Sequence, residues 1–134
     1  MQQDIAKDSI ATYDNPEFIL IIMHEFSHGY TSPLFNGECI DENRLAFLMR
    51  FKNELQEALD AAHEFPWEKP PGALTQEEYN LITKFVKELL DVRGMIDNFL
   101  PRLQREYKFS IKKLMKKMKQ SWKARKWMKL SYEH

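Results

Sequence analysis

The chain has a single cysteine, Cys39, and only four glycines among its 134 residues. One cysteine cannot form a disulfide framework, so a small secreted scaffold held by disulfides is excluded and a reducing cytoplasm is the expected location. Few glycines together with 43% hydrophobic residues are typical of a compact helical protein. The length favours a single domain that spans residues 1–134.

Long apolar runs and signal-like segments are also missing. The longest apolar run, residues 18–23, is far shorter than the roughly 20 residues that cross a bilayer. Residues 1–8 lack the basic and then apolar layout of a signal peptide. We therefore expect no membrane partner.

Charge is balanced overall but divided unevenly along the chain. Residues 1–101 carry 8 Lys or Arg against 18 Asp or Glu, a net charge of −10, whereas residues 102–129 carry 12 basic residues against Glu106 alone. A basic helix beside an acidic body can bind phosphate groups across the boundary. The same lysines can equally form a solvated helix face, and the sequence leaves both interpretations open.

Capping residues and prolines mark the helix boundaries. Asn15 and Pro16 predict a helix start, and Thr75 with Glu78 forms a capping box at the start of another helix. Ser110 predicts the cap of the last helix, and Pro101 predicts an end or a kink before it. The expected helices cover residues 17–28, 41–63, 75–100 and 109–128.

These helices predict an all-α protein, because no segment shows the alternating pattern of a strand. We expect a four- to five-helix bundle with its core in residues 17–100 and a basic C-terminal helix at 109–128. A short connector joins the second and third helices, so these two should pack antiparallel.

Two acidic pairs stand out on these two helices. Glu54 and Glu57 lie three residues apart, as do Glu88 and Asp91, so each pair points from one helix face. Four crowded carboxylates repel one another unless a cation neutralises them, and hard divalent cations prefer oxygen ligands. The pattern predicts a magnesium site that handles a nucleotide.

The spacing of these acids resembles the ExxE…ExxD signature of the MazG-like all-α nucleotide pyrophosphohydrolases, which include dimeric dUTPases and dCTPases. Here 30 residues separate the two motifs. The segment 87–92 (KELLDV) is similar to a family segment, and the last helix resembles a basic family tail. The departures are Asn53, where many relatives have glutamate, and Ser121, near an expected asparagine. The resemblance covers roughly residues 24–126.

This resemblance implies an activity and a set of site residues. Magnesium, or manganese in its place, would be bound by Glu54, Glu57, Glu88 and Asp91, and Glu54 and Glu57 would be catalytic, with Glu57 as the base. The reaction would convert a nucleoside triphosphate to the monophosphate and pyrophosphate in a homodimer or homotetramer, as in phage enzymes that control the nucleotide pool. The base is not decided among dGTP, dUTP and dCTP. The implied substrate contacts are Asn98, Trp67, Lys117, Arg125 and His24.

Two other classes compete with this interpretation. His24-Glu25-Phe26-Ser27-His28 matches HExxH, in which two histidines bind zinc and the glutamate activates water, and Glu38 or Glu42 could supply a third ligand. A small helical protein-binding or nucleic-acid-binding module would instead use the basic segment 102–129. Nucleic acid is the less expected partner.

Overall fold

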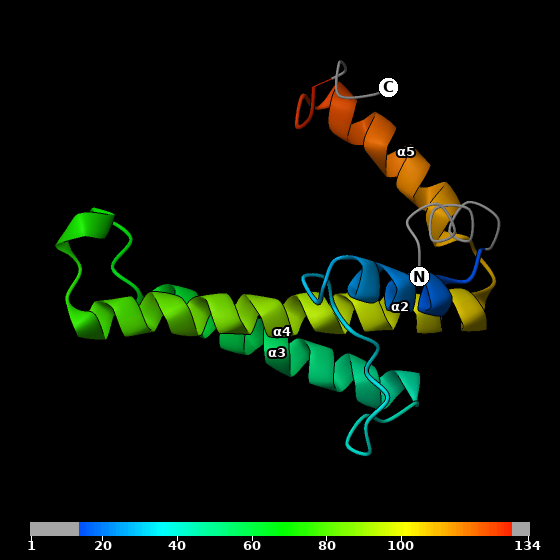
Figure 1. Ribbon diagram of the computed structural model, residues 1–134, viewed down its shortest axis with the longest axis horizontal. Helices are drawn as coiled ribbons and strands as arrows, with labels where there is room; N and C mark the ends of the chain where they lie inside the picture. The colour runs from blue at the N-terminus through cyan, green and yellow to red at the C-terminus, as the bar shows by residue number, and fades with distance from the viewer. Residues whose placement is uncertain (1–13, 130–134) are drawn as a thin grey trace.

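The computed structural model describes residues 14–129, and within this range the chain forms helices and no strand (Figure 1). The all-α class is therefore confirmed. The elements in chain order are α2 (Pro16–Phe26), α3 (Arg44–Glu64), the short 3-10 helix η1 (Pro71–Ala73), α4 (Gln76–Tyr107) and α5 (Ile111–Ala124).

The frame of the molecule is an antiparallel hairpin of α3 and α4 (Figure 1). Asn43 caps α3 by accepting hydrogen bonds from the backbone N–H groups of Leu45 and Ala46. Thr75 and Glu78 form the predicted capping box at the start of α4. These caps satisfy backbone donors that have no partner inside the helix, so both starting points are fixed locally.

Few apolar side chains are fully buried. The buried apolar residues are Phe47, Ala58 and Ala61 of α3, Met95 of α4 and Ile22 of α2. The Phe47 and Phe51 rings lie 5.1 and 6.0 Å from the Phe99 ring, measured between centroids. The small side chains of Ala58 and Ala61 allow the two helices to approach closely. The three phenylalanine rings pack between α3 and α4 near the start of α3.

Pro101 lies inside α4, which continues to Tyr107. Of the two expectations for Pro101, a helix end or a kink, the helix end is therefore wrong. A proline removes one helical hydrogen bond and usually costs about 3 kcal/mol. Here the proline and its neighbours Asn98 and Arg102 are buried, and the packing of this turn compensates for the lost bond.

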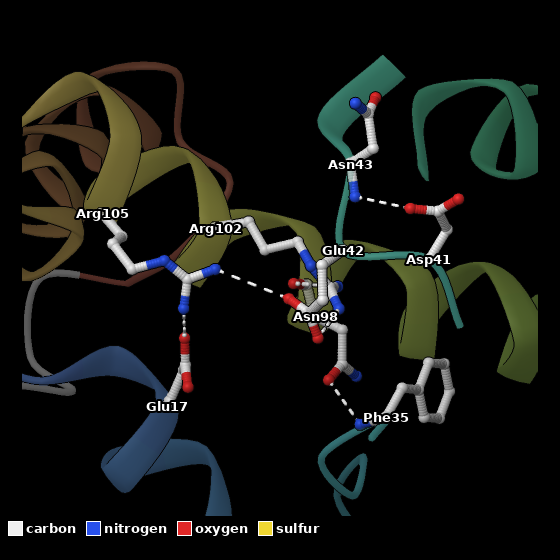
Figure 2. Close-up of polar contacts among 8 residues, drawn as sticks. All are labelled: Glu17, Phe35, Asp41, Glu42, Asn43, Asn98, Arg102 and Arg105. Carbon is white, nitrogen blue, oxygen red and sulfur yellow. Dashed lines mark hydrogen bonds and ion pairs between the residues drawn. The ribbon is translucent and has the colours of Figure 1, made fainter. Parts of the chain in front are cut away.

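The segment around Pro33 and Phe35 packs on the C-terminal half of α4. Asn98 is only 2% exposed, and its side-chain carbonyl accepts a hydrogen bond from the Phe35 N–H (Figure 2). Its amide donates to the Pro33 and Gly94 carbonyls. A Cβ atom at Gly94 would lie 2.5 Å from the Phe35 ring. The glycine therefore makes room for that ring against α4.

Helix α5 extends away from the hairpin (Figure 1), and none of its residues is buried. Lys108, with φ of 60°, turns the chain at the end of α4, and Ser110 then caps α5 as predicted. No helix among residues 14–129 is both long and apolar enough to cross a membrane.

Candidate functional site

Three carboxylates meet between the two helices of the hairpin. Glu54 and Glu57 project from α3 and Glu88 from α4, and one oxygen of each lies within 4.8 Å of the others. Within residues 14–129 this is the one group of three or more side chains with metal-binding atoms at such distances. The convergence predicted from the spacing is present for these three residues.

Asp91 lies one turn from Glu88 on α4 and belongs to the same electrostatic environment. It is outside the group of three converging oxygens, and its side chain is exposed. Its charge nevertheless contributes to raising the pKa of both Glu54 and Glu88. The fourth predicted ligand is therefore close enough to act on the cluster but does not complete it in this conformation.

Burial and repulsion both oppose ionisation in the cluster. Burial is the main cause of the raised pKa of Glu54, followed by the charges of Glu57, Asp91 and Glu88. Burial also raises the pKa of Glu88, with further contributions from Glu57 and Asp91 and from a hydrogen bond with Glu57. Glu54 and Glu88 therefore hold their protons more tightly than isolated carboxyl groups do.

The Oε2 atom of Glu88 is buried and has no hydrogen-bond partner. A buried oxygen without a partner costs roughly 1–3 kcal/mol, and native structures rarely keep one without a reason. Carboxylate oxygens that converge, repel one another and lack donors form the ligand set that a hard divalent cation prefers. The residues present fit such an ion.

Two basic side chains flank the cluster. Arg50 lies one helical turn before Glu54, and Lys84 one turn before Glu88, and each opposes the rise in pKa of the glutamate that follows it. Lys84 also pairs with Glu64 at 3.3 Å. Neither residue was predicted from the sequence, although the i, i+4 spacing from each motif was the signal that could have found them.

Trp67 lies in the connector at the hairpin end nearest the cluster. Its indole N–H donates to the Ala62 carbonyl, and its ring packs edge-on against Phe65 and Phe85. Phe85 precedes Glu88 by less than one turn, and Trp67 remains 56% exposed. Its ring is therefore fixed near the acidic cluster with a large part of its surface in solvent.

Asn98 is placed elsewhere. It follows Glu88 by ten residues, which is about 15 Å along a helix, and its amide already binds three backbone groups. In this chain it anchors the segment around Phe35 to α4, and the predicted contact with substrate has no support in the geometry.

A small polar cavity of about 130 Å³ adjoins Asn98. Its charged residues pair with each other: Arg102 lies 3.3 Å from Glu42, and Arg105 lies 2.6 Å from Glu17 (Figure 2). Because these charges balance, the cavity needs no ligand to compensate them. The pairs tie α2 and the segment before α3 to α4.

Lys117 and Arg125 belong to α5 and its end, which lie apart from the middle of the hairpin (Figure 1). Arg125 stacks on the Trp127 ring, 4.0 Å from its centroid. Within one chain these two residues do not join the acidic cluster, and their contact with a triphosphate stays a prediction.

The HExxH segment does not form a continuous helix. Helix α2 ends at Phe26, Ser27 caps it, and His28 has a left-handed φ of 56°. The Nδ1 atom of His24 is hydrogen-bonded to the Thr31 carbonyl. The two histidines therefore lack the shared helix face that a zinc peptidase requires. Of the suggested third ligands, Glu42 is paired with Arg102 and Arg105. His24 serves to close the turn after α2, and its role as a substrate contact remains a prediction.

Comparisons of the chain with protein-family models, with curated proteins and with solved structures find no match. The case for a function therefore depends on the geometry of the cluster and its surroundings.

Proposed function

We propose that the protein is a magnesium-dependent nucleoside triphosphate pyrophosphohydrolase of the MazG-like type. The observation that carries this proposal is the convergence of Glu54, Glu57 and Glu88, the last of which also has a buried oxygen without a partner. A structural role explains this arrangement poorly, because a cluster of like charges destabilises the fold unless something neutralises it. A cation and the phosphates that it binds would do so.

Each residue near the cluster has a distinct chemical task in this proposal. Glu54, Glu57 and Glu88 would hold the ion, and Asp91 would reach it by a rotation of its side chain. When bound, magnesium polarises a phosphoryl group and lowers the pKa of a coordinated water. Glu57 is the most exposed of the three converging glutamates, so it is best placed to orient and deprotonate the attacking water.

The chain also offers groups for the rest of the substrate. Arg50 and Lys84 would donate hydrogen bonds to phosphate oxygens, because they flank the cluster on both helices. The Trp67 ring would stack on the base, since it is held firmly on Phe85 and partly exposed.

We also propose that two copies associate through the hairpin. Both helices carry large apolar side chains that remain exposed and recur at helical spacing. They are Leu45, Met49, Leu55 and Leu59 on α3, and Tyr79, Val86, Leu89, Leu90, Ile96 and Leu100 on α4. We call these residues the apolar hairpin face.

The size of the apolar hairpin face suits a stable interface. Its ten side chains expose on the order of 900 Å², against about 800 Å² per partner in a standard protein–protein interface. The chain exposes 10296 Å² in total, whereas a compact monomer of 16.1 kDa exposes roughly 7,400 Å². A second copy placed on this face would remove roughly a third of that excess, and a tetramer would extend the same principle.

The test is a panel of ribo- and deoxyribonucleoside triphosphates incubated with magnesium or manganese, with the products separated by chromatography. We expect monophosphate and pyrophosphate, and no turnover after chelation of the metal. Glu57→Gln should reduce kcat by at least about 10³-fold, while Glu68→Gln, an exposed change in the connector, should leave it intact. Release of orthophosphate, or no turnover of any triphosphate, would refute the proposal.

A further inference from the structure

Helix α5 is amphipathic, with its apolar side chains on one side and its basic side chains on the other. At about 100° per residue, Ile111, Leu114, Met115, Met118 and Trp122 fall within roughly 100° of the helix circumference. Lysines occupy most of the remaining circumference, and no acidic residue occurs between positions 107 and 132. We call the five apolar residues the α5 apolar stripe.

The described chain leaves Leu114, Met115 and Met118 of the α5 apolar stripe exposed, while Ile111 and Trp122 are half-buried. No residue of α5 is buried, and Leu114, Met115 and Met118 each keep 40% or more of their surface exposed. The helix leaves the hairpin at the Lys108 turn and projects from it (Figure 1). Packing among residues 14–129 therefore does not explain why one side of α5 is apolar.

We propose that α5 binds the surface of an anionic lipid bilayer and lies in the interface with its apolar stripe inserted. A helix that combines a narrow apolar side with a wide, lysine-rich polar side is typical of such elements. Lysine stems beside the stripe can extend along the acyl boundary while their ammonium groups contact anionic headgroups. Trp122 and the exposed Trp127 suit the headgroup region, where one part of the ring is apolar and another is wet.

The charge distribution fits the same occupant. Residues 1–101 carry a net charge of −10, which an anionic surface would repel. The basic residues are concentrated in the part that projects, so a bilayer can be contacted by α5 while the acidic hairpin stays in solution. Electrostatic repulsion falls off within about 10 Å at moderate salt. Because this inference uses no part of the acidic cluster, it does not depend on the hydrolase activity.

Other partners explain the helix less completely. Nucleic acid would use the lysines but has no use for exposed leucine and methionine, since bases stack on aromatic rings and phosphates bind charges. A protein groove deep enough to enclose the helix would bury lysines on both sides of the narrow stripe. A bilayer interface covers only the stripe.

The experiment is flotation of the full chain with vesicles of phosphatidylcholine alone or of phosphatidylcholine mixed with phosphatidylglycerol. We expect binding to the anionic vesicles only. Lys116→Gln with Lys119→Gln should weaken it about 25-fold, at roughly fivefold per lysine. Leu114→Ser with Met118→Ser, which leaves every charge in place, should weaken it about tenfold or more. Matched controls are Lys52→Gln with Lys87→Gln for charge, and Ile21→Ser with Met23→Ser for exposed apolar residues.

The melting temperature of each variant is measured by circular dichroism and its oligomeric state by light scattering. The α5 substitutions are at exposed positions, so melting temperature and oligomeric state should not change. The proposal is overturned if the wild type ignores anionic vesicles or if the apolar variant binds as well as the wild type, which would indicate a purely electrostatic partner such as nucleic acid. It is also overturned if the apolar variant changes the oligomeric state, which would assign the stripe to a subunit contact.

Discussion

Glu88→Gln should stabilise the metal-free protein while abolishing its proposed activity. In the folded chain, burial and the neighbouring charges hold the pKa of Glu88 above 4.5. A carboxyl group with a raised pKa favours the folded state fully below its unfolded pKa, and this contribution is lost as the pH rises through the folded value. At neutral pH the ionised Glu88 therefore costs stability, and a neutral amide removes that cost. Its N–H groups can also donate to the remaining carboxylates.

The gain should be modest, because the site is partly solvated and water screens the repulsion. For a chain of this size, a gain of about 1 kcal/mol would raise the melting temperature by about 3–5 °C. The gain should shrink as the pH is lowered toward 4.5, since wild-type Glu88 then becomes protonated and equivalent to the amide.

Magnesium should reverse the order of stability. At a concentration of about ten times its Kd, a bound ion stabilises the wild type by roughly 1.4 kcal/mol, whereas the variant has lost one of its converging ligands. The assay is thermal unfolding at neutral pH with and without magnesium, followed by circular dichroism. Without metal, the variant should have the higher melting temperature. On addition of magnesium, the melting temperature of the variant should rise much less than that of the wild type.

Glu68→Gln is the matched control, because it makes the same change at an exposed position in the connector, and it should shift neither curve. The reasoning is refuted if Glu88→Gln lowers the melting temperature without metal, which would mean that Glu88 makes stabilising contacts. It is equally refuted if magnesium raises the melting temperature of variant and wild type by the same amount, which would place the ion elsewhere.

Three further predictions concern the surroundings of the cluster. Leu59→Glu with Leu89→Glu should convert the proposed dimer to a monomer in light scattering, because it places charges in the apolar hairpin face, whereas Ile21→Glu on α2 should not. Asn98→Ala should lower the free energy of unfolding in urea by about 1–3 kcal/mol, since it leaves the partly buried Phe35 N–H and Pro33 carbonyl without these partners; an unchanged midpoint would contradict the anchoring role. Trp67→Ala should raise KM about tenfold with kcat nearly intact, and Trp67→Phe should return KM most of the way to the wild-type value. A Trp67→Ala variant with the same KM as the wild type would show that the ring only packs on Phe85.

Local signals account for the features that the sequence predicted well. The capping box of Thr75 and Glu78 and the cap at Ser110 depend on residues within one turn, so they could be recognised without knowledge of the fold. The antiparallel hairpin followed from the short connector. Once the hairpin was expected, the convergence of Glu54, Glu57 and Glu88 required only that each motif face the other helix.

The features that were missed depend on distant contacts. Pro101 alone predicts a helix end or a kink, but α4 continues through it, and the residues around it are buried. The hydrogen bonds that Asn98 makes with Phe35 and Pro33, more than 60 residues earlier in the chain, could not be recognised from its local sequence. The HExxH spacing does not indicate where α2 ends. The end of this helix determines whether His24 and His28 share one helix face.

Hydrophobic periodicity also cannot distinguish burial within a chain from burial between chains. Leu59 and Leu89 follow helical spacing as regularly as the buried Phe47 and Met95, yet they are exposed. By the 100° step of a helix, Glu54, Glu57 and Glu88 lie roughly 140–160° around their own helix from the centre of its residues in the apolar hairpin face. The carboxylates meet between α3 and α4, and the apolar residues point away from that contact, so a second copy can cover apolar side chains without covering the cluster. Association and substrate access therefore use different sides of the same pair of helices.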